Sequence, residues 1–363
     1  MEFGFFALSP QRSPEKTAPQ VLSDTVAEVC LAESLGFDVA WIAEHHFSNL
    51  SLSPSPLLLA GHLAGLTRQI ALGTGVVVLP LYQPMRLVEE IAYVDMLSQG
   101  RLRLGIGAGS QNHESRGLGT DVAHARERFL EVLDIIEMAF AEGRVAYQGR
   151  HFRIPETALS IRPLRAEGPP IYLAGLAEDE EVARRMAERG YIPFASAAWQ
   201  PVPAVAKKRA GYEAGYRAAG CDPGTMPFAV QRLIYVTDDR AEARRAAEAA
   251  RYTYRLVTSV KGASPEFDGA FIRERPMSGE DELEAILEAA MIGDAEKCAE
   301  RIVADVEALG LTHLSCFMNF GGMPSAGVRR SMERFARDVR PLVERALAGR
   351  APHRARRLGA ESG

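Results

Sequence analysis

The sequence predicts the α/β fold class and, within it, a (β/α)₈ (TIM) barrel with an insertion hairpin and a mobile lid. Short apolar runs rich in Val, Ile, Leu or Phe alternate along the chain with amphipathic segments. Eight such alternations in this length favour a closed barrel over an open doubly wound sheet. The expected strands span residues 2–8, 38–43, 70–79, 102–107, 170–174, 192–196, 227–236 and 312–317.

The helices between these strands are expected from their apolar periodicity. Leu22, Val26, Val29 and Cys30 fall on one helical stripe between the first and second strands. A second stripe follows the fourth strand, and the same alternation of run, turn and amphipathic segment continues to the eighth strand. This second stripe consists of Phe129, Leu133, Ile136 and Phe140.

Two connections are longer than simple barrel loops. Residues 144–169 contain the runs Phe152 to Ile154 and Ala158 to Ile161, which predict a small hairpin inserted between the fourth helix and the fifth strand. Residues 259–293 are rich in glycine and proline and predict a structureless segment that acts as a mobile lid. The Arg-rich end, residues 349–363, is expected to be disordered, which leaves one domain over residues 1–348.

Composition limits the classes of function. The chain has 363 residues, of which 47% are hydrophobic and 25% are charged, as in an ordinary globular protein. The net charge is −5 and no Lys/Arg block alternates with aromatic residues, so we expect no nucleic-acid partner. The apolar runs are too short for a transmembrane helix, and we expect no membrane association. The four cysteines have no paired spacing and no signal peptide is evident, so we expect a cytoplasmic protein.

A cluster of titratable residues follows the second expected strand. Glu44, His45 and His46 come where the apolar run Val39 to Ala43 ends, and barrel active sites lie at the carboxyl ends of the strands. Because neighbouring residues of an extended chain point to opposite faces, Glu44 and His46 should face one way and His45 and Phe47 the other. The alternative is that both imidazoles are packed, hydrogen-bonded groups. No further His, Cys or Asp follows at ligand spacing, so no metal is expected here.

Glycines follow the fourth expected strand. The run Gly105 to Ser110 does not match a dinucleotide-binding fingerprint, because the third glycine of that pattern falls on Ser110. Two interpretations of these glycines remain. They form a tight turn that needs small residues, or they let a flat aromatic cofactor or its phosphate tail approach the backbone.

Ten blocks of sequence, taken together, carry a family resemblance. They are Phe3 to Phe6, Gly36 to Trp41, Glu44 to Phe47, Gly73 to Pro80, Pro84 to Arg86, Asp95 to Ser98, Gly100 to Gly107, Leu118 to Asp121, Ile292 to Asp294 and Gly310 to Leu314. In this order and spacing they resemble the bacterial luciferase family of flavin-dependent monooxygenases, over about residues 1–345. The resemblance implies a barrel that is usually dimeric, takes up reduced FMN from a separate flavin reductase and uses it to activate O₂ on a small-molecule substrate.

The resemblance also implies roles for particular residues. His45 matches the family's catalytic histidine, which handles protons during the oxygen chemistry, and Glu44 is expected to orient one of the imidazoles. The bond between Gly75 and Val76 matches a non-proline cis peptide beneath the flavin ring. The other expected cofactor-binding residues are Gly107, Ala108, Gly109, Ala174, Gly175, Leu176 and the basic side chain of Arg116.

The chain departs from the family pattern at the expected phosphate site. Ala108 stands where an arginine is common, and the acidic run Glu178 to Glu181 should repel a phosphate. An F420-dependent hydride-transfer oxidoreductase therefore stays an alternative, as does a non-catalytic flavin-binding homologue. An apolar set of expected pocket walls suggests a small to medium, hydrophobic substrate. These walls are Leu8, Leu79, Trp199, Phe317, Met318 and Phe320.

Overall fold

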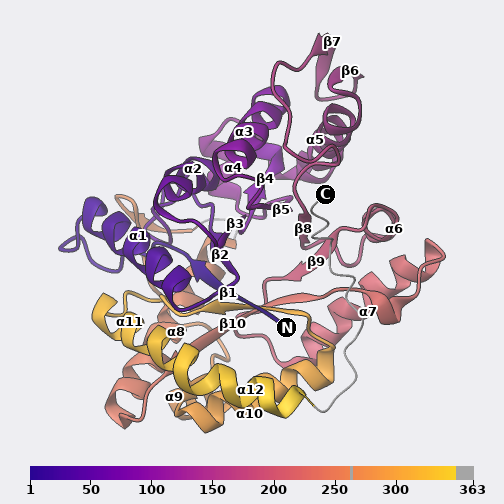
Figure 1. Cartoon of the computed structure of the whole chain (residues 1–363). Helices are drawn as coiled ribbons and strands as arrows, with labels where there is room; N and C mark the ends of the chain where they lie inside the picture. The colour runs from indigo at the N-terminus through magenta and orange to yellow at the C-terminus, as the bar shows by residue number, and fades with distance from the viewer. Residues whose placement is uncertain (262–264, 349–363) are drawn as a thin grey trace.

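All eight expected strands are present and close into a parallel barrel (Figure 1). The computed structural model describes residues 1–261 and 265–348, so the expected disordered tail at 349–363 lies outside the described residues. Each barrel strand pairs with two parallel neighbours, and β14 closes the ring by pairing with both β10 and β1. In order around the ring, the strands are β1 (Glu2–Ala7), β2 (Val39–Ile42), β3 (Ala71–Thr74), β5 (Leu102–Gly107), β8 (Ile171–Ala174), β9 (Ile192–Ala195), β10 (Ala229–Val236) and β14 (His313–Phe317).

Local signals in the sequence set the ends of several helices. Ser55 accepts a hydrogen bond from the Leu58 amide at the start of α2, and Asp294 accepts one from Lys297 at the start of α10. Gly143 ends α5 in the left-handed conformation. None of the described helices has the length and apolar composition needed to cross a membrane. The helices around the barrel are α1 (Ala18–Ser34), α2 (Pro56–Leu66), α3 (Pro84–Leu97), α5 (Ala125–Glu142), α6 (Glu180–Arg189), α7 (Val202–Ala218), α10 (Ala295–Leu309), α11 (Ser325–Arg334) and α12 (Arg340–Leu347).

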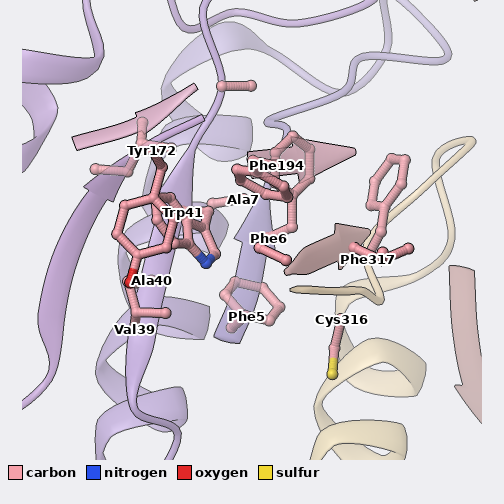
Figure 2. Close-up of a cluster of buried hydrophobic side chains, with 14 of the residues drawn as sticks. Phe5, Phe6, Ala7, Val39, Ala40, Trp41, Tyr172, Phe194, Cys316 and Phe317 are labelled. Atoms are coloured by element: carbon pink, nitrogen blue, oxygen red, sulfur yellow. The ribbon is translucent and has the colours of Figure 1, made fainter. Parts of the chain in front are cut away.

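Aromatic side chains fill the interior of the barrel (Figure 2). The Trp41 ring lies 4.7 Å from the Tyr172 ring and 5.0 Å from the Phe194 ring, measured between centroids. Glycines on the two neighbouring strands make room for it, because a Cβ on Gly4 or Gly73 would lie within 2.6 Å of an atom of the Trp41 side chain. The interior is therefore a packed core rather than a pore, and a ligand must bind at one end of the barrel.

The hairpin expected within residues 144–169 is present, but the predicted strand pair is wrong. The strands are β6 (Arg144–Gln148) and β7 (Arg153–Ala158), so the first strand begins directly after α5. Two features explain this register. Val145 is buried, and Glu131 of α5 accepts hydrogen bonds from the backbone amides of residues 150–152 in the turn.

The prediction that residues 259–293 lack regular structure is also wrong. Helix α8 (Arg240–Lys261) continues to Lys261, and the described residues after it form a hairpin of β11 (Phe267–Asp268) and β12 (Phe271–Ile272), a short helix α9 (Leu283–Ala289) and β13 (Met291–Gly293). Strand β13 pairs with the carboxyl end of β10. The hairpin is held by Asn49. Its side-chain Oδ1 accepts a hydrogen bond from the Ile272 amide at 2.9 Å, and its backbone amide donates one to the Ala270 carbonyl at 2.9 Å.

Helix α8 lies across the carboxyl end of the barrel. The hydroxyl of Tyr252 is 3.3 Å from Nδ2 of Asn49, which follows β2. The Tyr254 ring lies 5.6 Å from that of Trp199, which follows β9. A Cβ on Gly321, which follows β14, would strike the carbonyl of Ala249. One helix thus contacts the loops after three strands, and it covers part of the end where barrel enzymes have their active sites.

Glu28 on α1 is a buried carboxyl group that predicts a pH-dependent stability. Burial raises its pKa to about 7, although Asn319 Nδ2 and Ser325 Oγ donate hydrogen bonds to it at 2.7 and 3.1 Å. The unfolded carboxyl titrates near 4.5, so the folded state binds the extra proton between these values. Stability should therefore fall as the pH rises from about 4.5 to 7, by about 3 kcal/mol at most.

Replacing Glu28 by glutamine should remove this loss, because the amide keeps the shape and carries no charge. We expect Glu28→Gln to be more stable than the unmodified protein at pH 8 and similar to it at pH 4.5, in urea unfolding at both values. The exposed Glu15→Gln is the control. A stability difference between the two proteins that is the same at both pH values would contradict the assignment.

Candidate active site

The expected cluster lies where β2 ends, in a loop that the chain fixes in place. His45 donates its backbone amide to the Ser53 carbonyl at 3.0 Å, and Ser53 Oγ donates to the Ala43 carbonyl at 2.7 Å. Glu44 and His46 point to the same side and contact each other, as the alternation of an extended chain predicts. The loop is therefore rigid, and it presents Glu44 and His45 in opposite directions.

His45 is held by two side chains of the short helix α4 (Asn112–Gly117) and its preceding residue. Its Nδ1 is 3.0 Å from Glu114 Oε1 and 3.1 Å from Gln111 Nε2. The same carboxylate oxygen accepts from the His46 amide at 3.0 Å. Because a carboxylate only accepts, Glu114 favours a proton on Nδ1, and the Gln111 amide nitrogen, itself a donor, then contacts Nδ1 without a hydrogen bond. This leaves Nε2, on a ring that is 23% exposed, as the nitrogen that can meet a ligand.

The charge state of Glu114 supports this arrangement. Burial alone would raise its pKa, but the hydrogen bonds from His45 and from the His46 amide outweigh burial and hold the pKa of Glu114 below its usual value. Glu114 is therefore a carboxylate at neutral pH. The carboxylate therefore holds one nitrogen of His45, and Nε2 is the nitrogen that remains for a ligand.

Glu44 holds His46 rather than His45. Its Oε1 is 3.2 Å from His46 Nε2, and its Oε2 accepts from the Tyr82 hydroxyl at 2.8 Å and from the Val78 amide at 3.2 Å. Burial raises the pKa of Glu44. Burial would lower the pKa of His46, but its bond to Glu44 outweighs burial and raises it. These groups tie the exit of β2 to the segment after β3, which makes Glu44 a positioning residue.

Sequence reasoning missed Gln111, Glu114 and Tyr82. The signal for Glu114 was present, since a carboxylate follows the fourth barrel strand closely and could have been sought at every strand end. Tyr82 lies just after the short 3₁₀ helix η1 (Leu79–Leu81), and nothing in its local sequence marks it as a partner of Glu44.

The structure brings together three of the expected cofactor-binding segments. Val78 lies opposite Gly107 in the pairing of β4 (Val77–Val78) with β5, and Gly107 lies opposite Ala174 in the pairing of β5 with β8. The expected cis peptide between Gly75 and Val76 is present, and it separates β3 from β4 within the predicted strand 70–79. The exits of β3, β5 and β8 are therefore neighbours.

Glycines at the exit of β5 make room for side chains of the segment after β3. A Cβ on Gly107 would lie 2.9 Å from Val76 Cγ2, and one on Gly109 would lie 2.6 Å from Val78 Cγ1. Gly175 has φ +82°, and a Cβ there would meet no atom within 4 Å. Ala108 and Leu176, next to Gly109 and Gly175 in the chain, are half-buried. Of the three glycines, Gly175 is the one beside which a ligand could approach main-chain groups.

At the expected phosphate site, most carboxylates of the acidic run Glu178 to Glu181 are paired with basic side chains. Arg126 pairs with both Asp179 and Glu181, the latter at 2.8 Å, and Lys207 lies 3.5 Å from Glu178. Three of the four carboxylates thus have a basic partner. Arg116 is exposed on α4, where its Nε donates to the Asn112 carbonyl at 3.4 Å, and this structure does not bring it to the β8 exit.

Most of the expected pocket walls belong to the core. Five of the six are buried among other side chains, and Trp199 alone of the set is exposed, against Tyr254 of α8. These five walls therefore give no support to a hydrophobic substrate. The five are Leu8, Leu79, Phe317, Met318 and Phe320.

The β11–β12 hairpin touches the helix that holds His45. The Phe267 ring lies 5.4 Å from the ring of His113, the residue before Glu114. Both nitrogens of His113 are buried without a well-formed hydrogen bond among the described residues, and burial lowers its pKa. A neutral imidazole against an aromatic ring thus joins the hairpin to the candidate site.

The comparisons define the class of protein. The model of the luciferase-like monooxygenase family matches residues 1–313, and the chain belongs to this family. Uncharacterized protein y4vJ of Sinorhizobium fredii is 32% identical over 348 residues, which cover 96% of this chain and 99% of the relative.

Characterised relatives are more distant. An alkanal monooxygenase alpha chain of the Kryptophanaron alfredi symbiont is 27% identical and covers 95% of this chain and 99% of its own. The oxygenase component of a flavin-dependent trigonelline monooxygenase of Acinetobacter baylyi is also 27% identical, with 96% and 98% covered.

Solved structures confirm the fold. The monooxygenase RslO1 of Streptomyces bottropensis superposes with a TM-score of 0.82 at 24% identity, covering 94% of this chain and 99% of its own. An F420-dependent secondary alcohol dehydrogenase superposes with a TM-score of 0.73 at 21% identity, covering 94% and 98%. At these identities the likeness shows the barrel alone.

Proposed function

We propose that this protein is the oxygenase component of a two-component flavin-dependent monooxygenase. It takes reduced FMN from a separate flavin reductase and uses O₂ to oxygenate a small to medium organic substrate. The observation that carries the proposal is the His45–Glu114 pair at the end of β2, near the glycine-containing ends of β3, β5 and β8, in a chain of the luciferase-like monooxygenase family.

In this proposal, different segments hold the flavin and exclude water. Reduced FMN supplies the electrons that activate O₂. Gly75, Val76 and Gly107 would support its ring, and the segments Ala108 to Gly109 and Ala174 to Leu176 would offer main-chain groups to its tail. Helix α8 and the β11–β12 hairpin would keep water from the reacting atoms.

His45 would act as the proton-handling residue. Its Nδ1 is engaged by Glu114, so a proton arrives at or leaves from Nε2. The Glu114 carboxylate stabilises the positive charge that develops on the ring while Nε2 is protonated. Glu44 does not touch His45 and would act through His46 and Tyr82, by holding the loop in which His45 lies.

F420 is the second candidate cofactor, because an F420-dependent secondary alcohol dehydrogenase has the same barrel. Anaerobic titration with reduced FMN and, separately, with reduced F420 distinguishes the two. We expect saturable binding of reduced FMN that is at least about tenfold tighter than binding of reduced F420. The reverse order would replace the monooxygenase proposal by F420-dependent hydride transfer.

We also propose that the protein forms a homodimer through α2 and α3. Both helices present large apolar side chains to solvent, and Leu58 is 76% exposed, Tyr93 57%, Leu66 50% and Leu97 47%. Helix α2 has no charged residue, and α2 packs beside α3, so these side chains form one apolar face. Such a face is best covered by a second copy of itself.

The double variant Leu58→Lys with Tyr93→Lys tests the dimer. We expect it to sediment as a monomer at concentrations where the unmodified protein is a dimer, because two charges on each side oppose burial of the face. Leu22→Lys, on the exposed side of α1, is the matched control and should remain dimeric. A double variant that stays dimeric would place the interface elsewhere.

A further inference from the structure

A second cluster of potential ligands lies on the outer wall of the barrel, where the β6–β7 hairpin stands beside α5 (Figure 1). His124 ends the 3₁₀ helix η2 (Val122–His124), Glu127 lies in the first turn of α5, and His151 lies in the hairpin turn. One ligand atom from each of these three residues lies within 4.8 Å of the other two.

The distances approach those of a metal site. Glu127 Oε2 is 2.9 Å from His151 Nε2 and 3.7 Å from His124 Nδ1. Ligands of a tetrahedral zinc ion lie about 2.0 to 2.1 Å from the metal, so they stand about 3.3 Å from one another. Small side-chain rotations would bring these three atoms to that spacing. All three side chains are partly exposed, which leaves a path for the ion and a position for water.

The surrounding structure holds the ligands in place. The Glu131 carboxylate accepts the backbone amides of Arg150, His151 and Phe152, and so fixes the turn that carries His151 over α5. Arg150 Nη1 lies 2.9 Å from both oxygens of Glu127. Since Oε1 is not needed as a ligand, Arg150 can stay on that oxygen and support the carboxylate as an outer-shell partner does.

We propose that His124, Glu127 and His151 bind a divalent transition-metal ion of the zinc class, with water completing the coordination. Two imidazoles and one carboxylate are ligands that suit zinc, cobalt and nickel better than magnesium or calcium. The ion would join the inserted hairpin to α5 and to η2. This site is separate from the His45 region, so it would stabilise the fold and would not take part in the oxygen chemistry.

Titration of the full-length, metal-free protein with Co²⁺ tests the proposal through the visible d–d absorption of the bound ion. We expect one equivalent to bind and one equivalent of Zn²⁺ to displace it. Glu127→Gln and His151→Ala should each weaken binding by more than the roughly 10- to 100-fold that loss of an outer-shell partner costs. The variant Glu15→Gln, which changes an exposed carboxylate before α1, should bind as the unmodified protein does.

Two readouts make the result decisive. Zn²⁺ should raise the melting temperature of the unmodified protein and leave that of His151→Ala unchanged, because only a folded site that binds the ion is stabilised by it. Circular dichroism shows whether each variant is folded, and His124→Ala provides an independent loss of one ligand. Binding that persists unchanged in all three variants would place the ion elsewhere, for example at His45 and His46, and would overturn the proposal. Absence of binding to the unmodified protein would overturn it as well.

Discussion

Replacing His45 by alanine is expected to lower turnover by about 100-fold or more, while the fold and the affinity for reduced FMN change little. The ring lies at the rim of the barrel and is partly exposed, so its loss removes little packing. What is lost is the Nε2 position, the one that can exchange a proton with the reacting atoms. Steady-state turnover and product yield, with flavin affinity measured in parallel, check this result.

Two further variants separate the role of His45 from a structural one. Glu114→Gln keeps the shape of the partner but removes the carboxylate that fixes the proton on Nδ1, and we expect an intermediate loss of about 10- to 100-fold. Glu15→Gln changes an exposed carboxylate outside the site and should behave as the unmodified protein does. Unchanged product yield in His45→Ala would end the catalytic assignment.

Deleting the β11–β12 hairpin, residues 265–276, and joining the ends by a short Gly/Ser linker should uncouple the reaction. The barrel strands do not depend on this hairpin, so the variant should fold and still consume O₂ with reduced FMN. Without the hairpin, water reaches the site beside His113 and Glu114, and we expect most of the oxygen consumed to appear as hydrogen peroxide. The ratio of peroxide to oxygen consumed measures this directly.

Asn49→Ala is a milder form of the same change. It removes the hydrogen bond that Oδ1 accepts from the Ile272 amide and leaves the hairpin in the chain. We expect uncoupling between that of the deletion and that of the unmodified protein, because the hairpin should open more often. A deletion variant that produced no more peroxide than the unmodified protein would show that the hairpin does not protect the site.

The barrel could be predicted because strands buried on both faces are short apolar runs. Runs such as Val39 to Ile42 stand out against amphipathic helices on either side. Strand β13 was missed because three residues carry no periodicity, and β6 was missed because Arg144 to Gln148 alternates around only two apolar side chains. The hairpin in the expected lid depends on Asn49, more than 200 residues earlier, and local sequence cannot show such a contact.

The candidate site was predictable only where it is local in sequence. Glu44, His45 and His46 are consecutive and follow a strand, so position and chemistry coincide. Glu114 and Tyr82 contact them through the closure of the barrel, which brings the loops after different strands together. The order of the strands can be predicted from the alternation of apolar runs and amphipathic segments. The contacts between side chains at the barrel end depend on loop conformations, which the local sequence does not show.

A crystal structure of the protein with bound FMN tests the central claim most directly. The account predicts that the flavin ring packs against the Gly75–Val76 segment and Gly107, with Nε2 of His45 facing the reacting edge of the ring and Nδ1 still bound to Glu114. A flavin bound away from the ends of β2, β3 and β5, or one whose ring does not face His45, would contradict both the placement of the cofactor and the role of His45.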